Sequence, residues 1–396
     1  MDIPASDDNL CARGGWYPAF AMQPSAPPIW QTTAFDLDGL EQLESLTAGH
    51  ETGYLYTRDG NPNHDAFAGD MARLERAEAA FVAASGMGAF TAAALAHVAS
   101  GDHIVAARVL YGRTSQLLQH LQSAFGIGVT FVDATDPGAF SRAVTPRTKL
   151  AVVESISNPL LEVADVPAIA ESLGEIPLLV DSTFSTPCLL RPLEHGAALV
   201  FHSASKYLNG HGDVMLGVVA GRQSVIRRCR ELASLFGVNS NPFECWLASR
   251  GLRTLPLRME RVSSSALQIA RFLQSLPGVT RVYYPGLPEH SSHAVAKKLL
   301  TTGFGGMLSL ELEGGRPAVT RLFRALGDRI PFSPTLADAR TTFSYPAGTS
   351  HKFMTTEQRQ QAGIGDGLVR VSIGLESAAE LQQELTEGIR TAVTAQ

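Results

Sequence analysis

The sequence predicts an α/β protein with three parts: an N-terminal arm, a large domain on a mostly parallel sheet, and a smaller α+β C-terminal domain. Three observations predict this. From about residue 64 to 257, short apolar runs bounded by polar breakers alternate with helical spacing, as buried parallel strands and crossover helices do. The order then changes to helix, strand, strand, helix. The first 57 residues show little periodicity.

The arm is predicted over residues 1–57. Its chain breakers include Pro18, Pro24, Pro27 and Pro28. A structureless segment of this length is unusual inside a compact domain. We therefore expect the arm to pack against a neighbouring subunit, with the large domain over 58–257 and the small domain over 258–396.

The large domain begins with a helix predicted over 66–80, where apolar residues recur at helical spacing. Buried strands are expected at 104–110, 129–132, 150–153, 176–180 and 198–201, with a connecting helix at 166–173. In the small domain the pattern predicts helices at 263–276 and 318–325 and strands at 279–284 and 307–313. A ligand site is expected at the carboxyl ends of the parallel strands.

Composition excludes several classes of protein. The net charge of -6, without a long basic run, gives no general attraction to nucleic acid or to an anionic membrane. The 4 cysteines lie far apart and form no CxxC pair, so neither a disulfide framework nor a zinc site is indicated. The acidic N-terminus has no apolar signal region, and no apolar run approaches the ~18 residues of a membrane helix. We expect a cytoplasmic protein whose partners are small molecules or copies of itself.

Lys206 is the first candidate functional residue. It follows the apolar run 198–201, and Ser203 and Ser205 flank it in a short polar turn. A lysine between hydroxyls suits a cofactor that bears an aldehyde and a phosphate, because the amine can form an imine while the hydroxyls donate to phosphate oxygens. For these residues alone, a solvated lysine in a serine-rich turn is the alternative.

Asp181 closes the preceding apolar run, 176–181. A carboxylate at a buried strand end can pair with a pyridinium nitrogen, although an aspartate opening a turn is also common. Because Asp181 and Lys206 follow consecutive strands, both are predicted to reach one crevice.

Residues 85–88, SGMG, precede an alanine-rich helix and could hold a phosphate on free backbone N–H groups. A nicotinamide-binding fingerprint is disfavoured here, because position 91 is threonine and no acidic residue follows at the expected distance.

Seven motifs in order resemble the Cys/Met-metabolism (transsulfuration) family of enzymes that depend on pyridoxal 5'-phosphate (PLP). They are YLYTRDGNP (54–62), SGM (85–87), LYGRT (110–114), ESISNPLLEV (154–163), VDSTFSTP (180–187), HSASKYLNGHGD (202–213) and LVRVSIGLE (368–376). The resemblance implies a PLP-dependent aminotransferase-like fold of type I, in a homotetramer whose smallest active unit is a dimer.

The resemblance also implies roles for single residues. Lys206 and Tyr111 would be catalytic: Lys206 would form the Schiff base with PLP and carry protons, and Tyr111 would stack on the ring, whose nitrogen Asp181 would pair. The other cofactor contacts would come from Gly86, Met87, Ser203 and Ser205 on the phosphate, Asn158 near the ring hydroxyl, and Tyr56 and Arg58 reaching the phosphate from the neighbouring subunit. Arg370 would bind the substrate carboxylate, with Thr341 beside it.

The family carries out γ-substitution and γ-elimination at Cγ of amino acids. Arg113 stands where relatives commonly have Gly or Cys, and Arg340 where enzymes acting on cystathionine often have Glu. These arginines favour an anionic tail on the substrate or nucleophile, although solvent-facing arginines are the alternative. We predict γ-substitution on an activated homoserine by a thiol or related nucleophile.

The alternative reaction is γ-elimination, of the methionine gamma-lyase or cystathionine gamma-lyase type, giving a 2-oxo acid and ammonia. The segment 206–213 most resembles methionine gamma-lyase, so the two signals conflict. A binding protein that merely retains the fold is disfavoured, because the residues predicted to carry the chemistry are all present.

Overall fold

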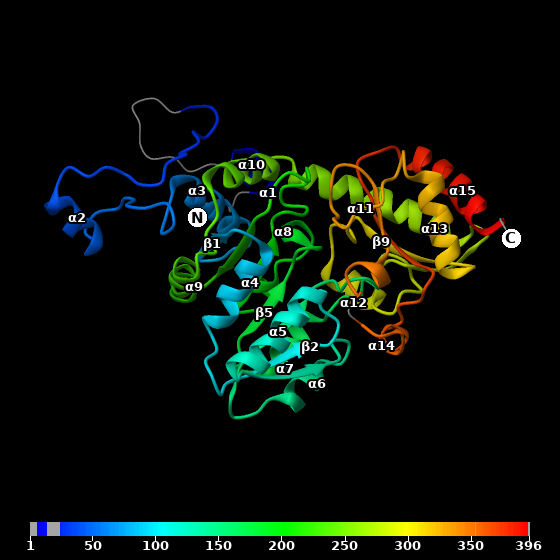
Figure 1. Ribbon diagram of the computed structural model, residues 1–396, viewed down its shortest axis with the longest axis horizontal. Coiled ribbons are helices and arrows are strands. Elements are labelled where there is room, and N and C mark those ends of the chain that lie inside the picture. The colour runs from blue at the N-terminus through cyan, green and yellow to red at the C-terminus, as the bar shows by residue number, and fades with distance from the viewer. Residues whose placement is uncertain (1–5, 14–23, 353, 395–396) are drawn as a thin grey trace.

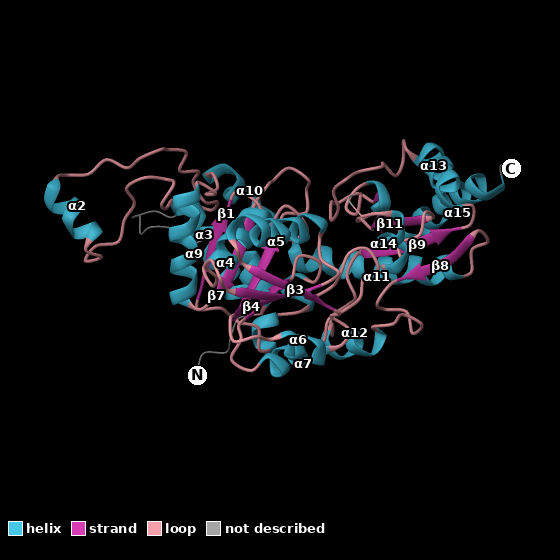
Figure 2. Cartoon of the chain, turned by 60° about the horizontal axis from the view of Figure 1, so that its bottom comes forward, coloured by secondary structure: helices cyan, strands magenta, loops and turns pink. Residues whose placement is uncertain are grey.

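A sheet of seven strands forms the centre of the large N-terminal part of the chain (Figures 1 and 2). The computed structural model describes residues 6–13, 24–352 and 354–394. The strands are β1 (Ala79–Ala83), β2 (His103–Ala107), β3 (Gly128–Val132), β4 (Thr148–Glu154), β5 (Leu178–Asp181), β6 (Leu199–Ser203) and β7 (Gly217–Gly221). Their order is β1-β7-β6-β5-β4-β2-β3, and only β7 pairs antiparallel with its neighbours. Most strand residues are buried because helices cover both faces, which explains the continuous apolar runs.

The helices of this part begin at residues suited to the start of a helix. In each of four helices the residue before the first turn accepts a backbone N–H of that turn: Asn61, Ser85, Asp165 and Asn241. A proline is the first or second residue of three of these helices. The helices are α3 (Pro62–Leu74), α4 (Gly86–Leu95), α5 (Gly112–Phe125), α6 (Pro137–Ala143), α7 (Val166–Leu173), α8 (Thr186–Leu189), α9 (Gln223–Phe236) and α10 (Pro242–Leu252), with a 3₁₀ turn at Pro192–His195. Helix α4 packs on β6 and β7, which brings its N-terminus beside the end of β6.

The C-terminal part contains a second sheet of four antiparallel strands in the order β10-β11-β9-β8. Its helices α11, α13 and α15 enclose a separate hydrophobic core against this sheet (Figure 2). The elements are α11 (Leu255–Gln274), β8 (Val279–Tyr283), α12 (His293–Leu299), β9 (Met307–Leu312), α13 (Gly315–Leu326), β10 (Thr342–Ser344), a 3₁₀ turn (Pro346–Gly348), α14 (Thr356–Gln361), β11 (Leu368–Ser372) and α15 (Ala378–Thr394).

The arm contains two short helices in its described residues, α1 (Asp7–Arg13) and α2 (Leu40–Thr47). Helix α2 has no buried residue and lies away from the rest of the chain (Figure 1). Residues 1–5 and 14–23, including Pro18 of the predicted arm, lie outside the described residues. In the part that the structure describes, no helix is long and apolar enough to cross a membrane.

The predicted α/β fold is confirmed, and several predicted bounds differ. The strand predicted over 104–110 ends at Ala107, and the helix predicted over 263–276 begins at Leu255. The helix predicted over 66–80 ends at Leu74, and residues 79–83 form β1, because this short apolar run pairs with β7 instead of continuing the helix. Helix α11 begins at Leu255, so the predicted boundary between residues 257 and 258 falls inside a helix. The division into three parts stays a prediction.

Candidate active site

The carboxyl ends of β4, β5 and β6 form a polar edge on an otherwise apolar sheet. Glu154 and Asp181 are register partners at the ends of β4 and β5. Ser203 ends β6, and its backbone N–H donates to the Thr183 hydroxyl at 2.9 Å. The strand ends that were predicted to share one crevice are therefore adjacent.

Lys206 lies in the turn after β6, where its backbone N–H donates to the Ser203 carbonyl. Its amine donates to Oγ1 of Thr335 at 2.9 Å. Burial, with a smaller effect of the Arg370 cation, lowers the pKa of Lys206 to about 8. A much larger fraction of this amine is therefore neutral near pH 8 than of an ordinary lysine. Thr335 was missed in the sequence, because it lies 129 residues away in none of the recognised motifs.

Two carboxyl groups, the buried Glu154 and the partly buried Asp181, end neighbouring strands beside this lysine turn. Burial raises the pKa of Asp181, while hydrogen bonds from Thr183 and the charge of His202 lower it. Burial and then the neighbouring Asp181 raise the pKa of Glu154 well above its usual range. Like charges this close resist joint ionisation unless a cation joins them. A pyridinium nitrogen would be such a cation, so the pair fits PLP.

Glu154 was not singled out from the sequence, although it begins one of the seven motifs. Its Oε1 accepts the backbone N–H of Tyr111 at 2.5 Å. This bond fixes the residue that precedes α5 against the end of β4. The Tyr111 side chain itself is 43% exposed, which leaves a face open to a ring stacked on it.

The N-terminus of α4 fits a phosphate group. Ser85 caps this helix by accepting the backbone N–H of Gly88 at 3.1 Å. A Cβ on Gly86 would stand 2.9 Å from the Cβ of Ser203, so only glycine lets the helix start approach the end of β6 this closely. Free N–H groups at a helix start attract anions. The structure therefore places Gly86 beside Ser203, while the phosphate contacts of Gly86, the half-buried Met87 and Ser203 stay predictions.

The hydroxyl of Ser205 has partners within the protein. It accepts the backbone N–H of Leu216 at 3.0 Å, so it also holds the loop that precedes β7. Its predicted role on the phosphate stays a prediction.

Arg370 reaches the site from the central strand β11 of the second sheet. Its guanidinium is buried and donates to Oδ1 of Asn158 at 3.0 Å. Burial lowers the pKa of Arg370 to about 10. Among the described residues no carboxylate forms an ion pair with Arg370. A buried guanidinium without an anionic partner is costly and is suited to bind a carboxylate brought by a ligand.

The other predicted substrate residues have different surroundings. The hydroxyl of Thr341 donates to Glu376 at 2.8 Å and accepts the Gly374 N–H at 3.0 Å. Arg113 lies on the exposed first turn of α5, where it donates to Gln116 at 3.0 Å. Arg340 is exposed and lies 3.8 Å from Asp338. Their roles in substrate binding stay predictions.

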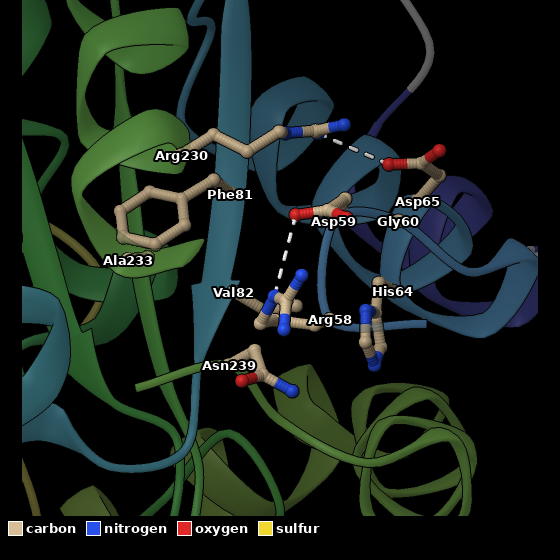
Figure 3. A pocket seen from close by; sticks show the side chains of 10 residues that line it. All are labelled: Arg58, Asp59, Gly60, His64, Asp65, Phe81, Val82, Arg230, Ala233 and Asn239. Atoms are coloured by element: carbon tan, nitrogen blue, oxygen red, sulfur yellow. Dashed lines mark hydrogen bonds and ion pairs between the residues drawn. The ribbon is translucent and has the colours of Figure 1, made fainter. Parts of the chain in front are cut away.

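Tyr56 and Arg58 lie next to each other, away from the lysine turn. The Arg58 guanidinium lies 5.0 Å from the centre of the Tyr56 ring and 3.7 Å from Asp59. Figure 3 shows Arg58 in a small cavity with His64 and Arg230, beside β1 and α9. No described contact joins Arg58 to Lys206 or Ser203, so a phosphate contact would need a second copy of the chain and stays a prediction.

Comparison with known proteins identifies relatives over almost the whole chain. Residues 9–390 match the family described as Cys/Met metabolism PLP-dependent enzyme. The L-methionine gamma-lyase of Porphyromonas gingivalis is 40% identical over 92% of each chain. The O-succinylhomoserine sulfhydrylase of Pseudomonas aeruginosa is 41% identical over 91% of this chain and 90% of its own. Crystal structures of cystathionine gamma-synthase from Xanthomonas oryzae pv. oryzae superpose with a TM-score of 0.92 at 35% identity, covering 98% of this chain and 99% of theirs.

Proposed function

Because the chain belongs to the Cys/Met metabolism family of PLP-dependent enzymes, we propose that it eliminates the Cγ substituent of an amino acid, as a carbon–sulfur lyase. In the sequence, Arg113 and Arg340 favour γ-substitution on an activated homoserine, with elimination as the alternative. The similarity to methionine gamma-lyases from several bacteria supports the alternative better, and this observation carries the proposal. Methionine or a related thioether amino acid would be the substrate.

Each part of the proposed reaction has a residue suited to it. PLP, when bound, supplies an electron sink that makes proton loss at Cα feasible. The amine of Lys206 would take that proton and return it, since burial lowers its pKa to about 8 and so raises the fraction that is neutral. Arg370 would hold the substrate carboxylate, and Tyr111 would stack on the cofactor ring.

Four more residues would hold the cofactor. Asp181 would pair with the ring nitrogen, and Gly86 with Ser203 would hold the phosphate. Asn158, already bonded to Arg370, would link the cofactor and carboxylate positions. We further propose that a dimer is needed, with Tyr56 and Arg58 completing the neighbour's phosphate site.

γ-Substitution remains the second candidate. The similarity to the O-succinylhomoserine sulfhydrylase supports it, as do Arg113 and Arg340 if they face an anionic substrate tail. Both reactions need the same proton transfers by Lys206 up to the loss of the Cγ substituent, after which Cγ gains a proton in elimination or a thiol sulfur in substitution. The substrate and the acceptor thiol must therefore distinguish them.

A panel of substrates separates the two reactions. The holoenzyme would be incubated with methionine, cystathionine or O-succinylhomoserine, each with and without a small thiol. We expect 2-oxobutyrate and a free thiol from methionine alone. Formation of a new thioether from O-succinylhomoserine, with no 2-oxo acid from methionine, would reverse the assignment in favour of substitution.

The binding of PLP to the apoprotein is expected to accelerate as the pH rises through about 8, the pKa of Lys206. Only the neutral amine can add to an aldehyde, and an ordinary lysine with a pKa of about 10.4 would still be protonated there. Stopped-flow absorbance over a pH series measures the rate. In Arg370→Ala the midpoint should move upward, because a cation that repels the protonated amine is gone. A rate that does not change with pH would contradict the prediction.

A further inference from the structure

A buried pair of ionisable side chains lies beneath the proposed cofactor site. Glu75 follows the last residue of α3, and His202 lies in β6 directly before Ser203. Their side chains are 0% and 1% exposed, and Nε2 of His202 lies 2.6 Å from Oε1 of Glu75. The other ring nitrogen, Nδ1, lies 3.0 Å from the carbonyl oxygen of Ser182, the residue after Asp181.

The geometry fixes how the ring is bonded. A carbonyl oxygen can only accept, so Nδ1 of His202 must donate to Ser182. The 2.6 Å contact then holds a further proton between Nε2 and Glu75, so the ring can be an imidazolium paired with a carboxylate. The second oxygen of Glu75 has no hydrogen-bond partner among the described residues.

Stability alone does not account for this arrangement. Burying an ion pair costs desolvation energy, and apolar replacements of such pairs are often neutral or stabilising. A carboxylate that leaves one oxygen unsatisfied is costlier still. An active site is where such a cost is commonly tolerated.

The His202–Glu75 pair lies where β5 and β6 end, and His202 links these two strand ends. Ser182 accepts from His202 and donates its own N–H to the Phe201 carbonyl at 3.0 Å. These bonds tie the residue after Asp181 to the residues just before Ser203. Register pairing ends here, since Asp181 and Phe201 are the last partners of β5 and β6. Beyond this point side-chain bonds must keep the strand ends together.

We propose that His202, held by Glu75, is a positioning residue that fixes Asp181 and Ser203 at the spacing that the ring nitrogen and phosphate of PLP require. The inference rests on the proposed roles of Asp181 and Ser203. The charge of His202 also supports the role of Asp181. Burial raises the pKa of Asp181, whereas hydrogen bonds from Thr183 and the charge of His202 lower it and favour the ionised carboxylate. Neither Glu75 nor His202 touches the substrate in this scheme.

The test uses Glu75→Gln and His202→Gln, with His103→Gln as matched control. His103 is a second buried histidine on a strand, and both of its ring nitrogens are hydrogen-bonded, to Thr148 at 2.8 Å and to Thr130 at 2.9 Å. It is the first residue of β2, so it lies at the amino ends of the parallel strands, away from the proposed site. For each variant one would measure the Kd of the apoprotein for PLP, the visible spectrum of the holoenzyme, kcat, KM and the Tm.

In both site variants the Kd for PLP is expected to rise about tenfold or more, and kcat to fall about tenfold or more, where tenfold corresponds to ~1.4 kcal/mol. KM should change less than about threefold, because the substrate carboxylate site is untouched. The control should keep both its Kd for PLP and its kcat. Glu75→Gln retains the size and one hydrogen bond of the side chain, so it remains measurable if His202→Gln does not fold.

Two results would overturn the inference: a Kd and kcat at wild-type values in Glu75→Gln, or equal losses in His103→Gln at an equal drop in Tm. Asp181→Asn separates failure here from failure of the proposed function. If that variant loses PLP affinity while the Glu75 and His202 variants do not, only this inference is wrong. If Asp181→Asn keeps the wild-type Kd for PLP and the wild-type kcat, the role proposed for Asp181 is wrong.

Discussion

Lys206→Ala is expected to lose about 10²–10⁴-fold in kcat, the usual contribution of a side-chain general base, together with the covalent attachment of PLP. The amine lies in the turn beside Asp181 and Ser203, and burial lowers its pKa, which raises the neutral fraction that can act as a base. Steady-state kinetics and mass spectrometry after chemical reduction of the holoenzyme would measure the two effects. An externally added amine should restore part of the activity, since it replaces the missing base.

Lys149→Ala is the matched control for this variant. Lys149 lies on β4 near the site strands but is exposed and far from their carboxyl ends. Its removal should leave kcat and the cofactor attachment unchanged. If Lys206→Ala still carried reducible PLP and kept more than a tenth of wild-type kcat, another residue would have to hold the cofactor.

Arg370→Ala is expected to lower kcat/KM for the amino-acid substrate by about 30- to 5,000-fold, since truncating one side of a buried charge pair costs ~2–5 kcal/mol. The guanidinium is buried on the central strand β11 and has Asn158 as its hydrogen-bond partner. Without it the substrate carboxylate would enter a buried site with no cation. The loss should appear mainly in KM, measured above the pH at which Lys206 titrates.

Arg370→Lys distinguishes charge from geometry. A lysine keeps the positive charge but has no planar fork for two parallel hydrogen bonds, so partial recovery is expected. Arg281→Ala, on the exposed edge strand β8 of the same sheet, is the control and should keep wild-type kcat/KM. An unchanged KM in Arg370→Ala would show that the substrate carboxylate binds elsewhere.

The sequence predicted the sheet and its active edge for a local reason. Strands β2, β4, β5 and β6 are buried on both faces, so each one appears in the sequence as a short apolar run. Parallel strands then bring their carboxyl ends together whatever the detail of packing. This rule predicts that Asp181 and Ser203 lie close together, without knowledge of any contact between them. Strand β1 did not, because its alanine-rich run is equally compatible with a helix.

Contacts between the two sheets could not be derived in this way. Thr335 meets Lys206 across 129 residues, and Arg370 meets Asn158 across 212. Such pairs depend on how the second sheet packs on the first, and no local pattern encodes that orientation. The substrate contact of Thr341 stays a prediction, and in the structure its hydroxyl is bonded to Glu376 and Gly374.

The sequence by itself therefore determined the family, the cofactor and the sheet edge, because these depend on residues close together along the chain. The tertiary structure alone decided the environment of each side chain. Burial lowers the pKa of Lys206 and raises that of Asp181. The fold also buries His202 against Glu75 beneath the site. Burial is a property of all the elements that surround a group, and only the folded chain brings those elements together.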